Sequence, residues 1–186
     1  MMKTSELEKT AYEIRKSVLK SLFNAGSGHL GASLGLADIF TVLYFHFLNH
    51  KPENPAWENR DRLILSIGHV APVLYVSLAK SGYFPESELD NLRKMGSMLQ
   101  GHPAIAHKVP GLETTAGSLG HGLSIAVGMA LADKADNKNR KIVSIHGDGE
   151  LQEGSIWEGA MSAGHYNLNN LISIIDRNNV QIDGKT

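Results

Sequence analysis

Hydrophobic and polar positions follow two different patterns along this chain. Between residues 4 and 23, apolar side chains recur at steps of three and four with charged residues between them, and this pattern predicts an amphipathic helix. The glycines Gly26 and Gly28 follow it and favour its end there. Helical stretches are also predicted at 36–47, 71–80, 86–94, 118–133 and 153–165.

Short, mostly apolar runs, each with a single serine, form the second pattern. They occur at 63–67, 142–145 and 171–175, and each is followed by glycine or polar residues. Solid apolar runs that alternate with helices are typical of parallel strands buried on both faces. The predicted fold class is therefore α/β, a doubly wound and mostly parallel sheet with helices on both faces. We expect residues 1–186 to form one domain, cut short at its C-terminus.

Composition excludes several classes of protein. Of 186 residues, 42% are hydrophobic and 20% are charged, as in ordinary globular domains, and the net charge is −1. A chain without a basic block is not expected to bind nucleic acid. The absence of cysteine excludes disulfides and thiolate metal sites. No apolar run approaches the roughly 20 residues that span a bilayer, so we expect a soluble cytoplasmic protein with no membrane partner.

Two polar turns carry the strongest chemical signal. Gly147-Asp148-Gly149 follows one apolar run, and Asn178-Asn179 follows the next, about 30 residues later. The carboxyl edge of a parallel sheet is where ligands bind, so both turns are expected at one place. Carboxylate and amide oxygens suit Mg²⁺ or Ca²⁺, and glycines allow a phosphorylated ligand to approach the backbone. Alone, the same residues also fit a tight turn and an ordinary polar loop.

The sequence around these turns resembles a known family. Segment 147–154, Gly-Asp-Gly-Glu-Leu-Gln-Glu-Gly, followed by Asn178, resembles the thiamine diphosphate motif in its transketolase form. Further segments resemble other active-site blocks of that family and occur in family order, at 26–33, 66–69, 101–103 and 113–122. Because these blocks extend across nearly the whole chain, chance is not a serious explanation.

The resemblance implies thiamine diphosphate and Mg²⁺ or Ca²⁺ as cofactors. It implies that Asp148 and Asn178 bind the metal through their side chains and Val180 through its backbone carbonyl. The residues that it implies for cofactor binding are His69, Gly117, Ser118, Leu119, Asp148, Gly149, Glu150 and Asn178.

Catalytic roles are also implied by the resemblance. Histidine suits proton transfer to and from sugar oxygens near neutral pH, and His29 and His102 would face the reacting carbon while His69 lies beside the cofactor. Glu153 and Glu158 resemble carboxylates that connect two active sites across a subunit interface. The implied reaction transfers a two-carbon ketol unit between sugar phosphates.

Some features depart from the family pattern. His121 stands where glutamine is usual, and Leu30 replaces a common proline. The sequence ends at Thr186, before the family's further strands and another substrate-facing histidine. It also holds no counterpart of the pyrimidine-binding domain, whose glutamate activates the cofactor. We therefore expect a partner, a C-terminal transketolase subunit with that domain, and self-association into a dimer or heterotetramer.

Two other functions stay open. Deoxyxylulose-phosphate synthase has a similar cofactor motif, although the Glu-Leu-Gln-Glu-Gly continuation at 150–154 favours the transketolase branch. The chain also fits an inactive, truncated domain that binds metal diphosphate weakly or only dimerises. The sugars that serve as donor once a partner is supplied distinguish the two enzymes, and cofactor binding in the presence of a partner distinguishes the inactive domain.

Overall fold

The computed structural model describes residues 2–182 and 184–186. They form two compact units: one comprises residues up to 58 together with 69–115, and the other comprises 59–68 together with 116–186. Their functioning together as a single domain stays a prediction.

The first unit is helical. Its longest helix, α1 (Thr4–Ala25), buries Ala11, Ile14 and Val18 on one face, as the periodicity predicts. Gly26 ends this helix in the left-handed conformation, with φ of 66°, and its amide donates to the carbonyl of Leu22. The remaining elements of the unit are α2 (Gly31–Gly35), α3 (Ala37–Val42), η1 (Leu43–Phe47), α4 (Ala71–Lys80), η3 (Glu86–Asn91) and η4 (Ile105–His107).

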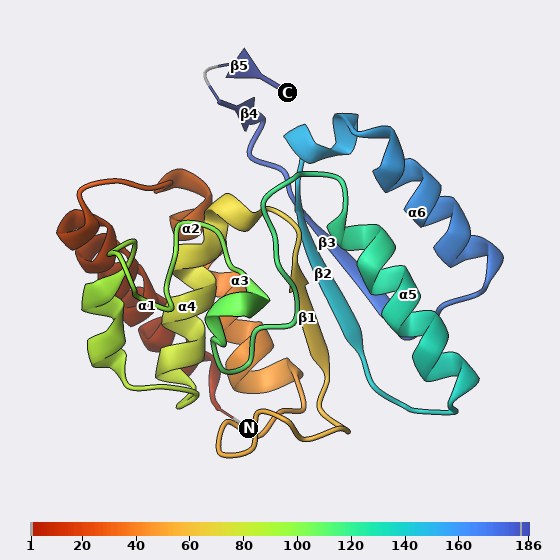
Figure 1. The fold of residues 1–186 in the computed structure, drawn as a ribbon, viewed down its shortest axis with the longest axis horizontal. Helices are drawn as coiled ribbons and strands as arrows, with labels where there is room; N and C mark the ends of the chain where they lie inside the picture. Colours follow the sequence, from red (N-terminus) through yellow and green to blue (C-terminus); the bar gives the residue numbers. More distant parts are fainter. Residues whose placement is uncertain (1, 183) are drawn as a thin grey trace. The chain divides into compact units, whose positions relative to one another are not determined.

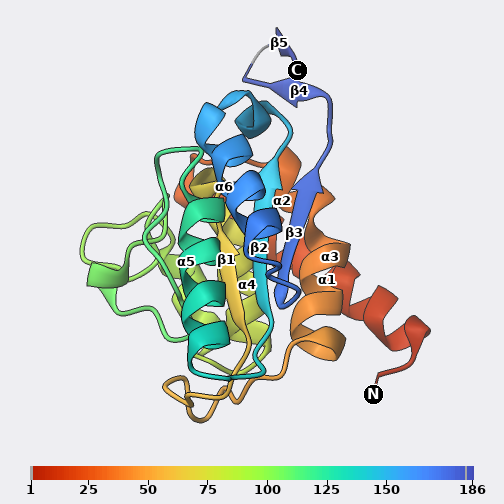
Figure 2. The same ribbon diagram turned by 90° about the vertical axis from the view of Figure 1, so that its right-hand side faces the viewer.

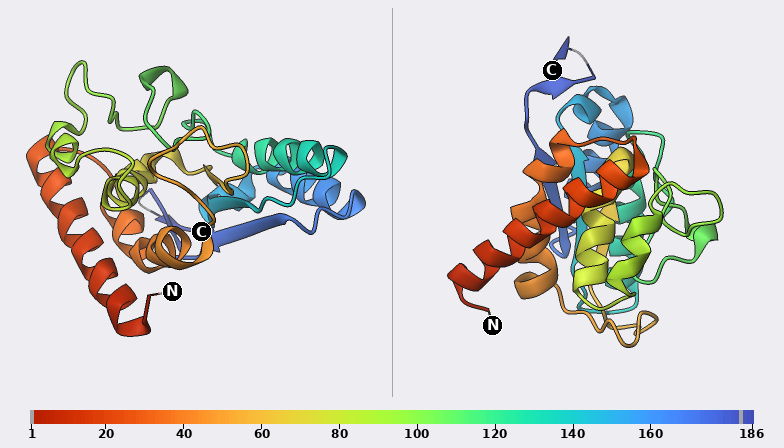
Figure 3. Two further views of the ribbon diagram at one scale, coloured as in Figure 1. Left: turned by 90° about the horizontal axis from the view of Figure 1, so that it is seen from below. Right: turned by 90° about the vertical axis from the view of Figure 1, so that its left-hand side faces the viewer.

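Helix α4 is the centre of this unit. It is buried from Ala71 to Ala79, and α1 lies across it in the right-hand view of Figure 3. Two predicted helices differ here from the structure. The stretch 36–47 is α3 followed by a wider π turn, because Leu48 donates to the carbonyl of Leu43, five residues back. The stretch 86–94 is only a short 3₁₀ segment, η3.

The second unit contains a parallel sheet (Figure 1). Strands β1 (Arg62–Leu65), β2 (Ile142–Gly147) and β3 (Leu171–Asp176) lie in the order β1-β2-β3, with Leu63 paired to Val143 and Val143 to Ile172. The predicted α/β class with a parallel sheet is confirmed. The other elements of the unit are α5 (Gly122–Ala135), η5 (Gly149–Gln152), α6 (Gly154–His165), β4 (Val180–Gln181) and β5 (Gly184–Lys185), and the short η2 (Gly68–Val70) has residues in both units.

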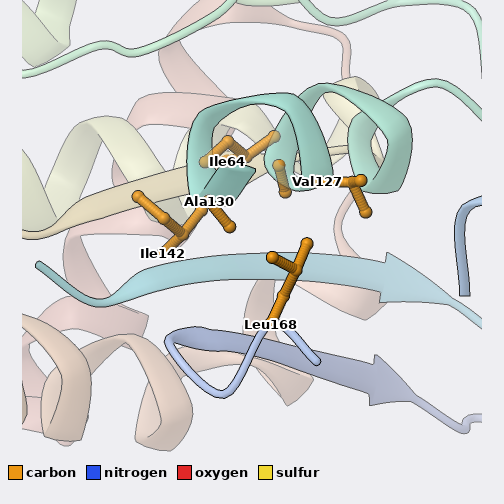
Figure 4. Packing of buried hydrophobic residues seen from close by; sticks show 6 residues of the cluster. Ile64, Val127, Ala130, Ile142 and Leu168 are labelled. Carbon is orange, nitrogen blue, oxygen red and sulfur yellow. The ribbon is translucent and has the colours of Figure 1, made fainter. Parts of the chain in front are cut away.

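Helices α5 and α6 lie side by side against one face of the sheet (Figure 2). Small residues of α5, Ala126 and Ala130, let this helix approach the strands closely, and they pack with Ile64, Ile142 and Leu168 (Figure 4). The predicted helix 118–133 begins only at Gly122, because Gly120 has φ of 84° and cannot continue a right-handed helix.

A groove of about 760 Å³ runs between α6 and the sheet. Its lining is largely apolar and includes Leu123, Ile156 and Leu171. Trp157 is 59% exposed beside it, and its indole nitrogen donates to the carbonyl of Leu151 at 2.8 Å. Among the described residues, no helix is long and apolar enough to cross a membrane.

Candidate functional site

The two polar turns meet at the carboxyl edge of the sheet in the second unit. Strands β2 and β3 are paired in parallel up to Gly147 and Asp176, so the residues that follow them emerge together. The amide of Asp148 continues this pairing with a hydrogen bond of 3.1 Å to the carbonyl of Asp176. Parallel register thus brings together residues that are far apart in the sequence, as the turn pattern predicts.

The carboxylate of Asp148 connects the two turns. Its Oδ1 accepts from the amide of Gly149 at 3.0 Å. Its Oδ2 accepts from the amide of Asn179 at 2.6 Å and from the hydroxyl of Thr186 at 3.0 Å. Asp148 is half-buried and directly follows β2 at the carboxyl edge of the sheet.

The second turn presents further oxygens next to this carboxylate. The side-chain oxygen of Asn178 accepts from the amide of Val180 at 2.9 Å, and its amide nitrogen donates to Asp176 at 3.2 Å. Burial raises the pKa of Asp176; the hydrogen bond from Asn178 opposes this rise, and the charge of Asp148 adds to it. Asp176 was not predicted from the sequence, although its place at the end of β3 matches that of Gly147 in β2.

This donor set fits a hard divalent cation. Each carboxylate or amide oxygen that accepts one hydrogen bond has a further lone pair, and Mg²⁺ and Ca²⁺ prefer such oxygens. Asp148, Asn178 and the carbonyl of Val180 are the residues that would hold the ion. Within 2–182 and 184–186, no three His, Cys, Asp or Glu side chains are grouped as metal ligands, so such a site depends on amide and backbone oxygens.

The glycine-rich loop is held from within the second unit. Gly117, Ser118 and Leu119 are exposed, whereas Gly120 and Gly122 are buried. The amide of Gly120 donates to Oε1 of Glu150 at 2.7 Å, and its carbonyl accepts from the hydroxyl of Ser155 at 2.8 Å. Glu150, which directly follows the turn at 147–149, therefore also contacts the glycine-rich loop.

Glu150 directs its side chain inward. The residue is 2% exposed, and burial acts to raise its pKa, but hydrogen bonds from His146, Ser66 and the amide of Gly120 hold the pKa below its ordinary value. A direct contact between Glu150 and a cofactor stays a prediction. Sequence reasoning missed the buried His146, because one polar residue inside an apolar strand has no pattern of its own.

The three predicted histidines come together in the first unit. The rings of His29 and His69 are 5.0 Å apart between centroids. Burial lowers the pKa of His102, and the nearby His29 and Arg93 lower it further. The structure thus groups side chains from three separate loops. The lowered pKa of His102 keeps its imidazole neutral near pH 7, so it can accept a proton.

Arg93 belongs to this group, and the sequence argument did not include it. A Cβ on Gly101 would lie 2.7 Å from a terminal guanidinium nitrogen of Arg93, so the guanidinium lies directly against the glycine that precedes His102. Arg93 has φ of 63°, and its amide donates to the carbonyl of Leu99 at 2.7 Å. No local sequence signal distinguishes this arginine from a surface one.

The two predicted interface carboxylates lie on helix α6 or just before it. Glu153 is the residue that precedes the first turn, and Glu158 lies on the helix itself; both are exposed. Their bridging role between subunits stays a prediction.

Comparisons with known proteins agree with this geometry. Residues 7–186 match the family model described as "Transketolase, thiamine diphosphate binding domain". The 6-deoxy-6-sulfo-D-fructose transketolase subunit of a Clostridium species is 47% identical over 181 residues, which are 97% of this chain and 66% of that protein. An apulose-4-phosphate transketolase subunit from Phocaeicola vulgatus is 43% identical over 185 residues, which are 100% of this chain and 65% of that protein.

Solved structures of transketolases are similar to this chain in fold. Transketolase from Campylobacter jejuni superposes with a TM-score of 0.92 at 43% identity, covering 99% of this chain and 30% of that one. Transketolase from Leishmania mexicana has a TM-score of 0.92 at 33% identity, and the match covers 100% of this chain and 29% of that one. This chain spans just under two thirds of the subunit relatives that it matches.

The fold and the match over nearly all residues define the class: an α/β thiamine diphosphate-binding domain. The chain belongs to the transketolase family and corresponds to the N-terminal, thiamine diphosphate-binding domain of its members.

Proposed function

We propose that this chain is the diphosphate-binding subunit of a two-chain transketolase, which transfers a two-carbon ketol unit between sugars. The observation that carries the proposal is the meeting of Asp148 with the 178–180 turn, through the 2.6 Å hydrogen bond from Asn179. It supports a single cation and diphosphate site at this edge. Family membership supports thiamine diphosphate as the ligand.

In this proposal the residues have separate tasks. Asp148, Asn178 and Val180 hold Mg²⁺, and Gly149 contacts the diphosphate through its backbone. When bound, thiamine diphosphate supplies the electron sink that carbon–carbon bond transfer next to a carbonyl requires. His29, His69 and His102 accept and return protons at the sugar oxygens. The lowered pKa of His102 favours the neutral imidazole that the accepting role needs.

A separate partner chain completes the enzyme in this proposal. Relatives that this chain matches nearly end to end are named as subunits, which supports a division of the enzyme between two chains. The partner would carry the pyrimidine-binding domain, and association of two such pairs would give a heterotetramer. Glu153 and Glu158 are exposed, as residues at a subunit contact must be before assembly.

The names of the same relatives support a proposal for the substrate class. One is named for a sulfonated ketose and another for a sugar phosphate. We propose a short ketose with a phosphate or sulfonate group as the donor. A panel of phosphorylated, sulfonated and uncharged ketoses, tested with the assembled pair, identifies it.

An assay of the chain with and without a partner chain tests the proposed ketol transfer. The purified chain is assayed with Mg²⁺, thiamine diphosphate and a ketose donor, alone and with the pyrimidine-binding chain of a two-chain transketolase. We expect ketol transfer only from the mixture. Transfer by the chain alone contradicts the partner requirement. A folded mixture that binds no thiamine diphosphate supports an inactive domain. Condensation of pyruvate with an aldose phosphate, with loss of the pyruvate carboxyl group as CO₂, supports the deoxyxylulose-phosphate synthase alternative.

A further inference from the structure

Glu150 is a fully buried acid whose three neighbours belong to three different segments. It lies two residues after Asp148, yet its side chain points into the second unit and the residue is 2% exposed. Burying a carboxylate is costly unless hydrogen bonds compensate it. The buried carboxylate of Glu150 therefore depends on its hydrogen-bond partners, whereas a solvent-exposed carboxylate in the same turn would not.

One oxygen of this carboxylate holds the glycine-rich loop. Oε1 accepts from the amide of Gly120 at 2.7 Å and from the hydroxyl of Ser66. The oxygen of Ser66 in turn accepts from the amide of Gly122 at 3.0 Å. Two amides at the end of the loop thus depend on Oε1, one directly and one through a single hydroxyl.

The other oxygen fixes the orientation of the carboxylate. Oε2 lies 3.1 Å from Nδ1 of His146, and Nε2 of the same ring lies 2.9 Å from the hydroxyl of Ser144. His146 and Ser144 are both buried, at 1% and 0% exposure. Because every polar atom in this chain of contacts has a partner, the group is rigid.

The outer part of the loop has little other support. A Cβ on Gly117 would meet no atom within 4 Å, and residues 117–119 are exposed. Gly120, at φ of 84°, has no side chain with which to pack. Ala116, just before this segment, is buried against Gly68. The position of residues 117–119 is therefore set at its two ends, and Glu150 acts at the 120–122 end.

We propose that Glu150 is a positioning residue: its carboxylate fixes the glycine-rich loop 117–122 relative to the Asp148–Gly149 turn, so that both present a preformed surface to the cofactor. This inference rests on the proposed function, because it assigns the loop and the turn to one ligand. Preformed contacts raise affinity because less ordering is left to occur on binding.

The test compares two substitutions of nearly the same size. In Glu150→Gln, the amide oxygen replaces Oε1 and keeps both loop contacts, while the NH₂ group faces His146. In Glu150→Met, an unbranched chain fills the space without an acceptor. Ser144→Ala is the control, because it changes the far end of the same buried network and leaves the loop contacts in place.

Amide hydrogen exchange on the 186-residue chain is the first measurement. The amides of Gly120 and Gly122 are compared with that of Ile142, which donates to the carbonyl of Asn170 in the same unit. We expect Glu150→Met to speed exchange at the two glycines by about tenfold or more relative to Ile142, as the loss of a charged acceptor implies. Glu150→Gln and Ser144→Ala should leave this ratio within about threefold of the original chain. An unchanged ratio in Glu150→Met overturns the proposal.

Affinity for thiamine diphosphate with Mg²⁺, measured by calorimetry with the partner chain present, is the second measurement. Glu150→Met should weaken binding by about tenfold or more, and Glu150→Gln should restore it. Weaker binding without faster glycine exchange contradicts positioning and indicates a direct contact. If the original chain binds no cofactor while the exchange results hold, the proposed function fails and the control of the loop by Glu150 stands.

A fourth variant covers the case in which Glu150→Met does not fold. Ser66→Ala removes the hydroxyl that links Gly122 to Glu150 and leaves the direct bond to Gly120. We expect faster exchange at Gly122 and a smaller change at Gly120. Equal effects on both glycines, or no effect on either, overturn the proposed arrangement.

Discussion

The amide of Asn179 donates a hydrogen bond of 2.6 Å to the carboxylate of Asp148, across 31 positions of sequence. This contact exists because β2 and β3 are parallel neighbours whose last paired residues are Gly147 and Asp176. It brings the two halves of the expected cofactor motif to one point. The metal site that we propose depends on this relationship.

Substitution of Asp148 by alanine tests the role of its carboxylate. We expect thiamine diphosphate affinity in the presence of Mg²⁺ to fall by about 100-fold or more, because changes to residues that only support metal ligands already cost about 10–100-fold. The free energy of unfolding should fall by no more than about 3 kcal/mol, because the carboxylate's hydrogen bonds are lost but no packing group is removed. Calorimetry and urea unfolding measure the two quantities.

The matched control is Asp136→Ala, an exposed carboxylate next to the end of α5. It should leave cofactor affinity unchanged. Unchanged affinity in Asp148→Ala itself would show that the cation is held elsewhere.

The histidine cluster predicts a pH effect. The pKa of His102 is lowered from its ordinary 6.5 by burial, His29 and Arg93. A histidine that binds fewer protons in the folded state stabilises the fold above its unfolded pKa, and this contribution is lost as pH falls through the lowered value. Removing the positive charge with Arg93→Met should raise the pKa of His102.

Titration of the imidazole signals by NMR measures this pKa directly. Lys94→Met, which removes an exposed charge from the next position, serves as the control. A His102 pKa that is the same in Arg93→Met as in the original chain would show that Arg93 has no electrostatic influence on it.

Gly122 predicts a steric effect. A Cβ at this position would overlap the side chain of Ser66 and lie 2.8 Å from its Cα. Gly122→Ala should therefore lower the free energy of unfolding by about 1–3 kcal/mol. Gly128, in the same helix, has no atom within 4 Å of an added Cβ, and Gly128→Ala should raise stability by about 0.5–1 kcal/mol. Urea unfolding of both variants checks the contrast; equal effects would contradict it.

Breaking a buried ion pair is expected to lower stability more than breaking an exposed one. Asp133 is 0% exposed on α5, and its carboxylate accepts from Nε of Arg140 at 2.9 Å and from a second guanidinium nitrogen. Asp133→Ala leaves Arg140 without this carboxylate and should lower the free energy of unfolding by about 3 kcal/mol. The exposed pair of Lys138 with Asp136 is the comparison, and Lys138→Ala should cost less than about 1 kcal/mol. Similar losses in both would contradict the argument from burial.

Elements with a strong apolar pattern were predictable from sequence. The helix at 71–80 and the strand at 171–175 match α4 and β3 closely, because solid apolar patterns leave few other arrangements. The start of α5 was not predictable. Alanine and leucine after Ser118 favour a helix, but the left-handed Gly120 and its bond to Glu150 keep that segment a loop.

The residues of the candidate site also divide into those that were predictable from sequence and those that were not. Asp148 and Asn178 were found because each follows an apolar run, and parallel pairing then had to bring them together. Asp176, His146 and Arg93 were missed because their significance comes from tertiary neighbours: the charge of Asp148, the carboxylate of Glu150 and the loop of His102. Such partners are far apart in sequence and have no periodic signal.

Paramagnetic broadening by Mn²⁺, used in place of Mg²⁺ together with thiamine diphosphate, tests the cation site most directly. The isotope-labelled chain is titrated with both, and its amide signals are recorded. We predict broadening centred on Asp148, Gly149 and the 178–180 turn, with the signals of Asp136 and Lys138 unaffected. Sharp signals at Asp148 and Asn178 under conditions where Mn²⁺ and the cofactor are bound would contradict the account.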